Sequence, residues 1–401
     1  MTDVFMKTYH RLPVSFSRGE GAWLFDVQGR RYLDFGAGIA VNCLGHGYPP
    51  LVKAIAEQAA RLNHVCNYYQ ADVTTAFAEK LVGACAGMRR VFMANSGSEA
   101  NEGACKIARK YSLRKYGPGR HRIVSLQGSF HGRTITALSA TGQEKFHRDF
   151  GPFTEGFLFV PPGDIEALAQ ALDPAVTAAL LLEPIQGESG IIPQSPAYME
   201  AAARLCAERD ILLMVDEVQC GMGRTGSFLA SEAYGIQPDV VTLAKGLAGG
   251  LPVGAVLAGE KAAEVLESSD HGSTFGGNPL AAAAGLVVLD RVTRPEFLAE
   301  ISRKGEKLMA ALRDRHHPRL KELRGRGLMI GADIDGEAWP VLEAGVARAN
   351  ASPQGASPGG ASPEGLLLLS AGAHTLRFLP PYIISDAELD QGLEILWELL
   401  A

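Results

Sequence analysis

Residues 91–102 read VFMANSGSEANE, and their pattern indicates the class of fold. It opens with a short apolar run typical of a buried strand, and a helical pattern follows over 98–116. Ser96 and Glu99 have the spacing of a capping box at a helix start. Gly97 lets a ligand approach the backbone, where the free N–H groups of a first helical turn favour a phosphate group. The stretch therefore predicts a strand, a tight turn and a helix, although an ordinary capped helix has the same pattern.

The same alternation continues through the middle of the chain. Six more apolar runs have the length and composition of buried strands: 123–126, 157–160, 178–182, 211–215, 240–244 and 253–258. Helical patterns separate several of them, at 164–172 and 196–209. Apolar strands that alternate with helices indicate a mostly parallel sheet covered on both faces. We therefore predict an α/β protein with a large domain over 46–285 and a smaller α+β domain over 286–401.

Two segments lie outside this alternation. Residues 1–45 contain a hairpin pattern around Gln28-Gly29, and we expect this segment to pack on the small domain or on a partner subunit. Residues 351–365 read ASPQGASPGGASPEG, three copies of a five-residue unit. Ala, Ser, Pro and Gly cannot build a packed core, so this repeat is predicted to be a flexible surface loop or tether within the small domain.

Composition and charge exclude several classes of protein. Of the 401 residues, 47% are hydrophobic and 20% are charged, which is typical of a globular chain. The net charge is −6 without a long basic block, which argues against a nucleic-acid partner. The longest apolar stretch, 280–289, is shorter than the ~18 residues of a membrane span, and residues 1–12 do not resemble a signal peptide. The six cysteines lack framework spacing. We therefore expect a cytoplasmic protein with no membrane partner and no metal.

Two charged residues follow predicted strands at the edge where open α/β sheets bind ligands. Asp216 ends the run 211–215, and its buried carboxylate needs a cation or a donor, which a structural ion pair would also provide. Lys245 follows the run 240–244. A lysine packed among apolar neighbours can have its pKa lowered toward that of a nucleophile, although a lysine in this position is usually solvated.

Together with the phosphate-binding turn at Gly97, these residues are the groups that pyridoxal phosphate requires. The lysine forms the Schiff base, and the carboxylate keeps the pyridinium nitrogen protonated. Phe130 offers an aromatic ring that can stack on the cofactor. The alternative is an NAD-dependent dehydrogenase, because residues 221–226 read GMGRTG and match GxGxxG. That motif should follow its strand directly and open a helix, which this segment does not do.

Seven motifs occur in order along the chain: NSGSEANE, SFHGRT, EPIQGESG, DEVQCGMGRTG, TLAKGL, GSTFGGNP and RFLPP. With them the sequence resembles the class III aminotransferases of the ornithine and acetylornithine type, from about residue 8 to the end. The resemblance implies a fold-type-I pyridoxal-phosphate-dependent transferase. It also implies two catalytic residues, Lys245 as the Schiff-base lysine and Asp216 as the partner of the pyridinium nitrogen. Retention of both argues against a non-catalytic relative.

The resemblance also implies the other residues of the site. The cofactor would be held by Gly97 and Ser98 at its phosphate, Phe130 on its ring, Val218, Gln219 and, from the partner subunit, Thr274. A contribution from Thr274 implies an obligate homodimer with shared active sites. The substrate would meet Tyr9, Arg133 for its α-carboxylate, and the pair Glu188 and Arg377, which could instead be a structural salt bridge.

The implied reaction moves the terminal amine of N2-acetylornithine to 2-oxoglutarate and gives N-acetylglutamate 5-semialdehyde and glutamate, a step of arginine biosynthesis. Chain length and the segment 63–69, which contains HVCNYY, favour this substrate. Sister activities toward ornithine, succinylornithine, acetyl-lysine or 4-aminobutyrate remain alternatives.

Overall fold

The computed structural model describes residues 4–350 and 364–401 of the chain. The predicted tether falls outside these ranges except for its last two residues. Of these, Gly365 is buried at the start of strand β15 (Gly365–Leu367), so the expected loop at that position is wrong. A β-carbon on Gly365 would lie 2.3 Å from Cδ1 of Tyr32, and the missing side chain therefore lets the two strands approach.

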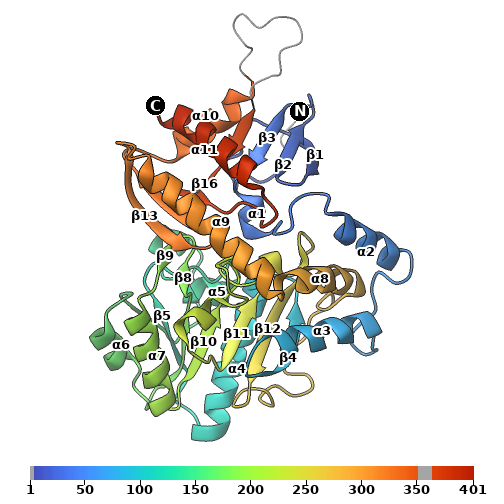
Figure 1. Ribbon diagram of the computed structural model, residues 1–401. Helices are drawn as coiled ribbons and strands as arrows, with labels where there is room; N and C mark the ends of the chain where they lie inside the picture. Colours follow the sequence, from blue (N-terminus) through green and yellow to red (C-terminus); the bar gives the residue numbers. More distant parts are fainter. Residues whose placement is uncertain (1–3, 351–363) are drawn as a thin grey trace, which may run out of the picture.

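A seven-stranded sheet forms the lower part of the molecule, in the order β4-β12-β11-β10-β7-β5-β6 (Figure 1). All seven predicted runs are strands: β4 (Met88–Ala94), β5 (Arg122–Leu126), β6 (Phe157–Val160), β7 (Thr177–Leu182), β10 (Leu212–Asp216), β11 (Val240–Leu243) and β12 (Gly254–Gly259). Strand β12 alone of these seven runs antiparallel to its neighbours β11 and β4. It follows β11 without the long helical crossover that a parallel pair needs. The mostly parallel α/β sheet is confirmed.

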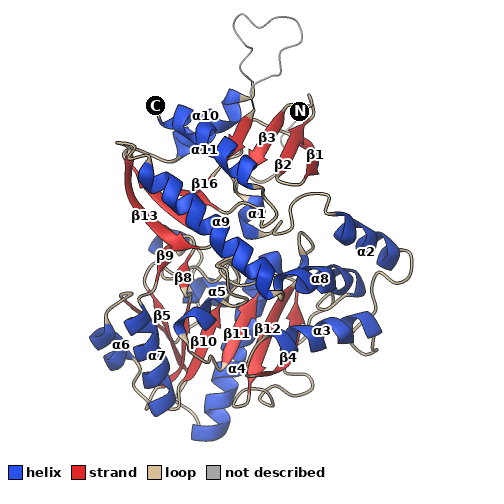
Figure 2. Ribbon diagram, in the orientation of Figure 1, coloured by secondary structure: helices blue, strands red, loops and turns tan. Residues whose placement is uncertain are grey.

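Helices cover both faces of this sheet (Figure 2). Helix α4 (Gly97–Tyr116) packs on one face, where Leu212 and Met214 of β10 point. The other face, toward Leu213 and Val215, is covered by α6 (Ile165–Ala171) and α7 (Pro196–Glu208). Beside them lie α3 (Asp72–Ala84) and α8 (Pro279–Val292), and α2 (Pro49–Ala59) packs on α8. Because helices bury both faces of the sheet, successive residues of a strand are apolar on both sides, which explains the uninterrupted apolar runs in the sequence.

The upper part contains two four-stranded sheets. One has the order β13-β14-β17-β16, from β13 (Leu320–Arg326), β14 (Met329–Ile334), β16 (Leu369–Ser370) and β17 (Thr375–Phe378). The other joins the predicted N-terminal hairpin to the C-terminal part, with β1 (Phe16–Glu20), β2 (Trp23–Asp26), β3 (Arg31–Asp34) and then β15. Helices α9 (Pro295–Asp314), α10 (Trp339–Arg348) and α11 (Asp386–Leu400) pack around these sheets.

Short elements connect these parts. They are α1 (Ala37–Ala40), α5 (Ile135–Ala140), η1 (Glu144–Phe146), the pair β8 (Ile185–Gln186) and β9 (Ile192–Pro193), η2 (Ala230–Tyr234) and η3 (Lys245–Ala248). Within the described ranges, every helix is too short or too polar to cross a membrane.

The contact between α3 and α8 leads to a stability prediction. A β-carbon on Gly285 would lie 2.4 Å from Cε2 of the fully buried Phe77. We expect Gly285→Ala to lower the free energy of unfolding by ~1–3 kcal/mol, because the core cannot take an extra methyl group. The matched control is Gly83→Ala in α3, where a methyl group meets open space and should stabilise the helix by ~0.5–1 kcal/mol. Chemical denaturation at one protein concentration measures both, and a stabilised Gly285→Ala would contradict the packing argument.

Candidate active site

A cavity of about 330 Å³ opens at the carboxyl edge of the large sheet. The ends of β10 and β11 and the first turn of α4 form its floor and walls, as expected for an open α/β sheet. Seven of the predicted cofactor-binding residues line it: Gly97, Ser98, Phe130, Asp216, Val218, Gln219 and Lys245. These seven residues come from four separate segments of the sequence, which the fold brings to one place.

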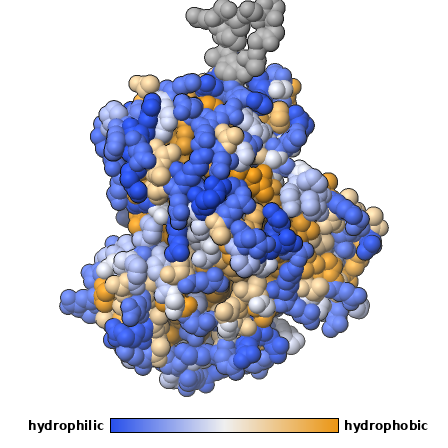
Figure 3. Space-filling model, in the orientation of Figure 1, coloured by the Kyte–Doolittle hydropathy of each residue, from blue (hydrophilic) through white to orange (hydrophobic). Residues whose placement is uncertain are grey.

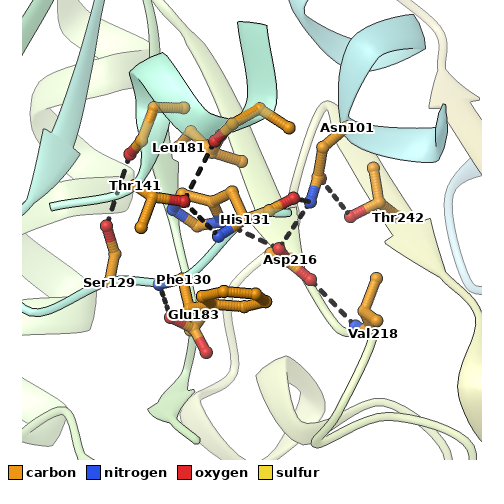
Figure 4. A network of polar contacts seen from close by, with 12 residues as sticks. Asn101, Ser129, Phe130, His131, Thr141, Leu181, Glu183, Asp216, Val218 and Thr242 are labelled. Atoms are coloured by element: carbon orange, nitrogen blue, oxygen red, sulfur yellow. Dashed lines mark hydrogen bonds and ion pairs between the residues drawn. The ribbon is translucent and has the colours of Figure 1, made fainter. Parts of the chain in front are cut away.

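The floor of the cavity is a buried hydrogen-bond network around Asp216 (Figure 4). Oδ2 of Asp216 accepts from Nδ2 of Asn101 at 2.8 Å and lies 2.8 Å from Nδ1 of His131. Oδ1 accepts from the backbone N–H of Val218 at 3.0 Å. Asn101 is oriented in turn by the hydroxyl of Thr242, which donates to its Oδ1 at 2.9 Å. The carboxylate is only 3% exposed, so these partners replace the water that it has lost.

A second buried carboxylate, Glu183, fixes the loop that carries the aromatic ring. Its Oε1 accepts from the backbone N–H of Phe130 at 2.9 Å, and its Oε2 accepts from that of Gly187 at 3.1 Å. Burial raises the pKa of Glu183, and the nearby His131 opposes this rise. Glu183 therefore ties Phe130 to the segment that leads into Glu188.

The first turn of α4 forms one end of the cavity. Oγ of Ser96 accepts from the N–H of Glu99 at 3.2 Å, as the capping-box spacing predicts. The reciprocal half of the capping box is absent, because Oε2 of Glu99 accepts instead from the backbone and side chain of Asn95 at 2.7 and 2.8 Å. A β-carbon on Gly97 would lie 2.7 Å from Cγ1 of Val218, so only glycine fits where this turn meets the cavity wall.

The remaining polar group of this turn is the hydroxyl of Ser98. Its Oγ accepts from the backbone N–H of Arg133 at 3.1 Å and keeps its own hydrogen for another acceptor. Gly132 makes this contact possible, because its φ is +138° and a β-carbon there would lie 2.3 Å from the same oxygen. The turn thus offers backbone N–H groups and one hydroxyl to an anion.

Lys245 lies two residues past the end of β11, whose Thr242 is paired in register with Asp216 at the end of the neighbouring β10. It has a φ of +47°, a left-handed conformation that is strained for a lysine. Burial lowers its pKa, although the carboxylates of Glu188 and Asp216 oppose this effect. A lysine whose amine is more readily neutral is suited to act as a nucleophile or base.

Beside the cavity, Glu188 and Arg377 form an ion pair of 2.5 Å between Oε1 and Nη1. Gln219 joins them, since its Nε2 donates to Glu188 at 3.1 Å and its Oε1 accepts from Arg377 at 3.1 Å. Burial would raise the pKa of Glu188, but the Arg377 guanidinium reverses this and leaves it below its usual value. Arg377 is 3% exposed and its Nε has no partner among the described residues, so one donor of this cation stays unused.

Three predicted residues lie at or beyond the edge of this arrangement. Arg133 is exposed, and its guanidinium lies 5.4 Å from the ring centre of Phe130 and 4.1 Å from that of Phe146. Tyr9 is 77% exposed and does not line the cavity. Thr274 is also exposed and lines a separate cavity with Asn95 and Glu99. The roles of all three residues stay predictions.

The glycine-rich segment 221–226 does not have the geometry of a dinucleotide site. Its turns lead into η2, a 3-10 helix that begins only at Ala230. Arg224 is fully buried and donates to the backbone oxygens of Leu328 at 3.0 Å and Pro380 at 2.6 Å. The segment therefore joins the large sheet to the upper part of the molecule.

Sequence reasoning missed four residues of the polar network: Asn101, His131, Glu183 and Thr242. Each lies in a motif or strand for which another residue, such as Gly97, Phe130 or Lys245, is predicted to bind the cofactor or the substrate. Asn101 had a usable signal, because it is polar on the same α4 face as Ala100 and Ala104, which pack on the sheet. His131 and Glu183 had none, because their positions relative to Asp216 depend on how distant strands pair.

Residues 4–400 match the sequence profile of the family described as Aminotransferase class-III. The chain belongs to the class-III aminotransferase family. An acetylornithine aminotransferase of Caldanaerobacter subterraneus is 46% identical, over 99% of this chain and 97% of its own length. Among solved structures, ornithine aminotransferase of Toxoplasma gondii matches with a TM-score of 0.91 at 33% identity, covering 99% of this chain and 92% of its own. N-acetylornithine aminotransferase of Stenotrophomonas maltophilia matches with a TM-score of 0.83 at 38% sequence identity, covering 98% of this chain and 96% of its own.

Family membership confirms a pyridoxal-phosphate-dependent transaminase of fold type I and leaves the dehydrogenase alternative without support. The cavity fits this cofactor. An anion-binding turn lies at one end, a buried carboxylate lies on the floor, and an aromatic ring and a lysine are in the wall. Across residues 4–350 and 364–401, no three His, Cys, Asp or Glu side chains are grouped to hold a metal ion.

The Asp216 network leads to a prediction about cofactor affinity. Asn101→Ala removes one charge-assisted hydrogen bond, worth ~1.5–3 kcal/mol, from the Asp216 carboxylate. We expect the dissociation constant of pyridoxal phosphate, measured by absorbance titration of the cofactor-free protein, to rise about tenfold or more. Thr242→Val is the matched control, because it removes only the bond that orients Asn101 and should weaken binding less. An unchanged affinity in Asn101→Ala would contradict this role.

Proposed function

We propose that this protein is an acetylornithine aminotransferase, which converts N2-acetylornithine and 2-oxoglutarate into N-acetylglutamate 5-semialdehyde and glutamate. Relatives with this name match the whole chain at 46% identity. The observation that carries the proposal is the cluster of Arg377, Glu188 and Gln219 beside the cofactor cavity. One site has to accept acetylornithine, with one carboxylate, and glutamate, with two, so it needs a cation that can be masked.

Pyridoxal phosphate, when bound, supplies a ring that withdraws electrons from the carbon that loses a proton. In the proposed arrangement Gly97 and Ser98 would hold its phosphate, and Phe130 and Val218 would hold its ring. Asp216 would be the partner of the protonated ring nitrogen. Its bonds to Asn101, His131 and Val218 keep the carboxylate in place without water, so its charge acts at full strength on that nitrogen.

Lys245 holds the cofactor through its amine and then acts as the general base. Because burial lowers its pKa, the amine is more often neutral at working pH than that of an exposed lysine. Its amine would take up the proton that leaves the substrate carbon bearing the amine, and its ammonium form would return that proton at the other end of the 1,3-shift. Glu188 and Asp216 limit the fall in its pKa, which keeps the protonated form available for the return step.

Substrate selection depends on two arginines. Arg133 is exposed and binds the α-carboxylate of acetylornithine, for which its planar fork is suited. While acetylornithine reacts, Glu188 stays paired with Arg377, so the Arg377 guanidinium is not free to face the neutral acetyl-amide group of this substrate. When glutamate or 2-oxoglutarate binds, Arg377 exchanges Glu188 for the second carboxylate of that substrate.

The assembly that we propose is a homodimer with shared active sites. The segment around Asn67 contacts the segment around Thr274, through Asn67 Nδ2 donating to Ser273 O at 3.0 Å and His64 against Phe275. Tyr68, Tyr69 and Phe275 are exposed there, and Figure 3 shows further apolar surface around α2. Soluble monomers rarely expose large apolar patches. A second copy would cover this face and bring Thr274 to its partner's cofactor phosphate, and light scattering of the protein in solution tests this.

Two further expectations about organisation belong to the same proposal. We propose a division of the chain into an N-terminal segment 1–45, a cofactor-binding domain 46–285 and a small domain 286–401. We also propose a cytoplasmic location, in keeping with the six free cysteines and with a step of arginine biosynthesis.

The second candidate is an ornithine aminotransferase, favoured by the high TM-score of 0.91 to the Toxoplasma gondii enzyme. Steady-state kinetics on acetylornithine, ornithine, succinylornithine, acetyl-lysine and 4-aminobutyrate separate the candidates. We expect the highest kcat/KM for acetylornithine, and a higher value for ornithine would overturn the proposal.

Lys245→Ala tests the assignment of the catalytic lysine. Loss of a general base alone typically costs ~10²–10⁴ in rate, and loss of the cofactor's attachment point adds to this. Treatment of the wild-type holoenzyme with borohydride should fix the cofactor to Lys245, as mass spectrometry of peptides would detect. Lys106, an exposed lysine that does not line the cavity, serves as control, since Lys106→Ala should keep activity and labelling. Labelling of another lysine in Lys245→Ala would refute the assignment.

Glu188→Ala and Arg377→Ala test the masking of the second cation. Removal of Glu188 leaves Arg377 free for glutamate, and a charge-assisted hydrogen bond is worth ~1.5–3 kcal/mol. In single-turnover kinetics, Glu188→Ala should therefore favour the glutamate half-reaction over the acetylornithine half-reaction by about tenfold or more. Arg377→Ala should shift the ratio the other way and raise the KM for 2-oxoglutarate.

Glu188→Gln is the control for charge, since it keeps a hydrogen-bonding side chain of the same size. It should act in the same direction as Glu188→Ala. Equal slowing of both half-reactions in all three variants would show that the pair is a structural salt bridge.

A further inference from the structure

Segment Ala37–Ala40 forms one turn of left-handed helix. Its four residues have φ values of +45°, +63°, +64° and +63°. The turn is closed by backbone hydrogen bonds from Ala40 to Gly36 at 3.2 Å and from Val41 to Ala37 at 2.8 Å. Only Gly38 adopts this conformation without strain, because a β-carbon crowds the following carbonyl in the other three residues. Such strain persists only where surrounding contacts impose it.

Asp34 imposes the start of the turn. Its Oδ1 accepts from the backbone N–H groups of Gly36 at 2.9 Å and Ala37 at 2.8 Å. Its Oδ2 lies 2.9 Å from Nε2 of His46, which fixes the carboxylate from the other side. Asp34 is 3% exposed, so water does not compete for these bonds.

The far end of the turn lies against the segment that carries the catalytic lysine. The carbonyl oxygen of Ala40 lies 3.5 Å from the position that a β-carbon of Gly246 would take. Cys43 extends the contact, since its Sγ donates to the carbonyl of Gly246 at 3.4 Å. Gly246 follows Lys245, whose own φ is +47°. Two strained segments therefore support each other at the cavity wall, to which Val41 also contributes.

We propose that Asp34 is a positioning residue for Lys245, which it reaches through the left-handed turn Ala37–Ala40 and Gly246. The carboxylate holds the turn, the turn blocks relaxation of the backbone at Gly246, and Lys245 therefore keeps the conformation that directs its amine into the cavity. This inference rests on the role proposed above for Lys245.

Asp26 provides a matched control in the same sheet. It is also buried, and its Oδ1 also accepts from two backbone N–H groups, those of Gln28 and Arg30, both at 2.9 Å. It does not line the cavity, and the hydrogen bonds of its carboxylate go to Gln28, Arg30 and Tyr32, which lie outside the turn. A general loss of stability in this sheet should therefore follow from Asp26→Ala as well as from Asp34→Ala.

The test compares the holoenzymes of Asp34→Ala, Asp26→Ala and Asp34→Asn. The readouts are the visible circular dichroism of the bound cofactor, its rate of release, and kcat and KM measured separately. In Asp34→Ala we expect reduced dichroism, faster release and a kcat lowered about tenfold to hundredfold, as for a misplaced reacting group, with little change in KM. Asp34→Asn keeps an oxygen acceptor for the two N–H groups, so its circular dichroism and kcat should stay close to those of the wild type. Asp26→Ala should lower the melting temperature without changing the dichroism.

Equal effects in Asp34→Ala and Asp26→Ala would overturn the inference, as would an Asp34→Asn variant no better than Asp34→Ala. The variant Lys245→Ala tests the proposed role of the lysine separately. If the visible circular dichroism of the bound cofactor is unchanged in Lys245→Ala, the role proposed for Lys245 is wrong, whatever the Asp34 variants show. The two failures are therefore distinguishable.

Discussion

A negative charge held without water at Asp216 is the constraint on which the rest of the site depends. A carboxylate that is 3% exposed is stable only with several donors, and here they come from α4, from the loop after β5 and from its own strand end. Because these donors belong to distant parts of the chain, satisfying the charge also fixes those elements relative to one another. The cofactor cavity is the space that this arrangement leaves open at the edge of the sheet.

Two buried arginines help to tie the upper part of the molecule to this edge. Arg224, with no exposed surface, reaches the backbone of Leu328 and Pro380, while Arg377 on β17 reaches back to Glu188 and Gln219. Among the described residues Arg224 donates to two backbone oxygens, and its Nε and Nη2 have no hydrogen-bond partner. Arg377 is paired with a carboxylate that is partly exposed, and the exchange with a substrate carboxylate proposed above depends on that pair.

Four of the ten non-glycine residues with a positive φ in the described ranges lie in two segments beside the cavity. They are Lys245 and three residues of the turn Ala37–Ala40, and the two segments lie side by side. Close approach elsewhere is left to glycine, as at Gly97 against Val218. The protein thus uses stability from its core to hold a few residues in conformations that an isolated peptide would leave.

Local pattern was enough to predict the seven strands, the helices at 98–116, 164–172 and 196–209, and the positions of Asp216, Lys245 and Gly97, because each depends on hydrophobic periodicity or on a motif within a few residues. Tertiary structure alone decided that Asn101, His131 and Thr242 surround Asp216, that Glu99 bonds to Asn95 instead of closing the capping box, and that Gly365 joins a strand. It also decided the left-handed turn, whose residues carry no local signal for it. The reason is physical: these features depend on contacts between residues far apart in the chain, and no local periodicity encodes which distant groups will satisfy a buried charge.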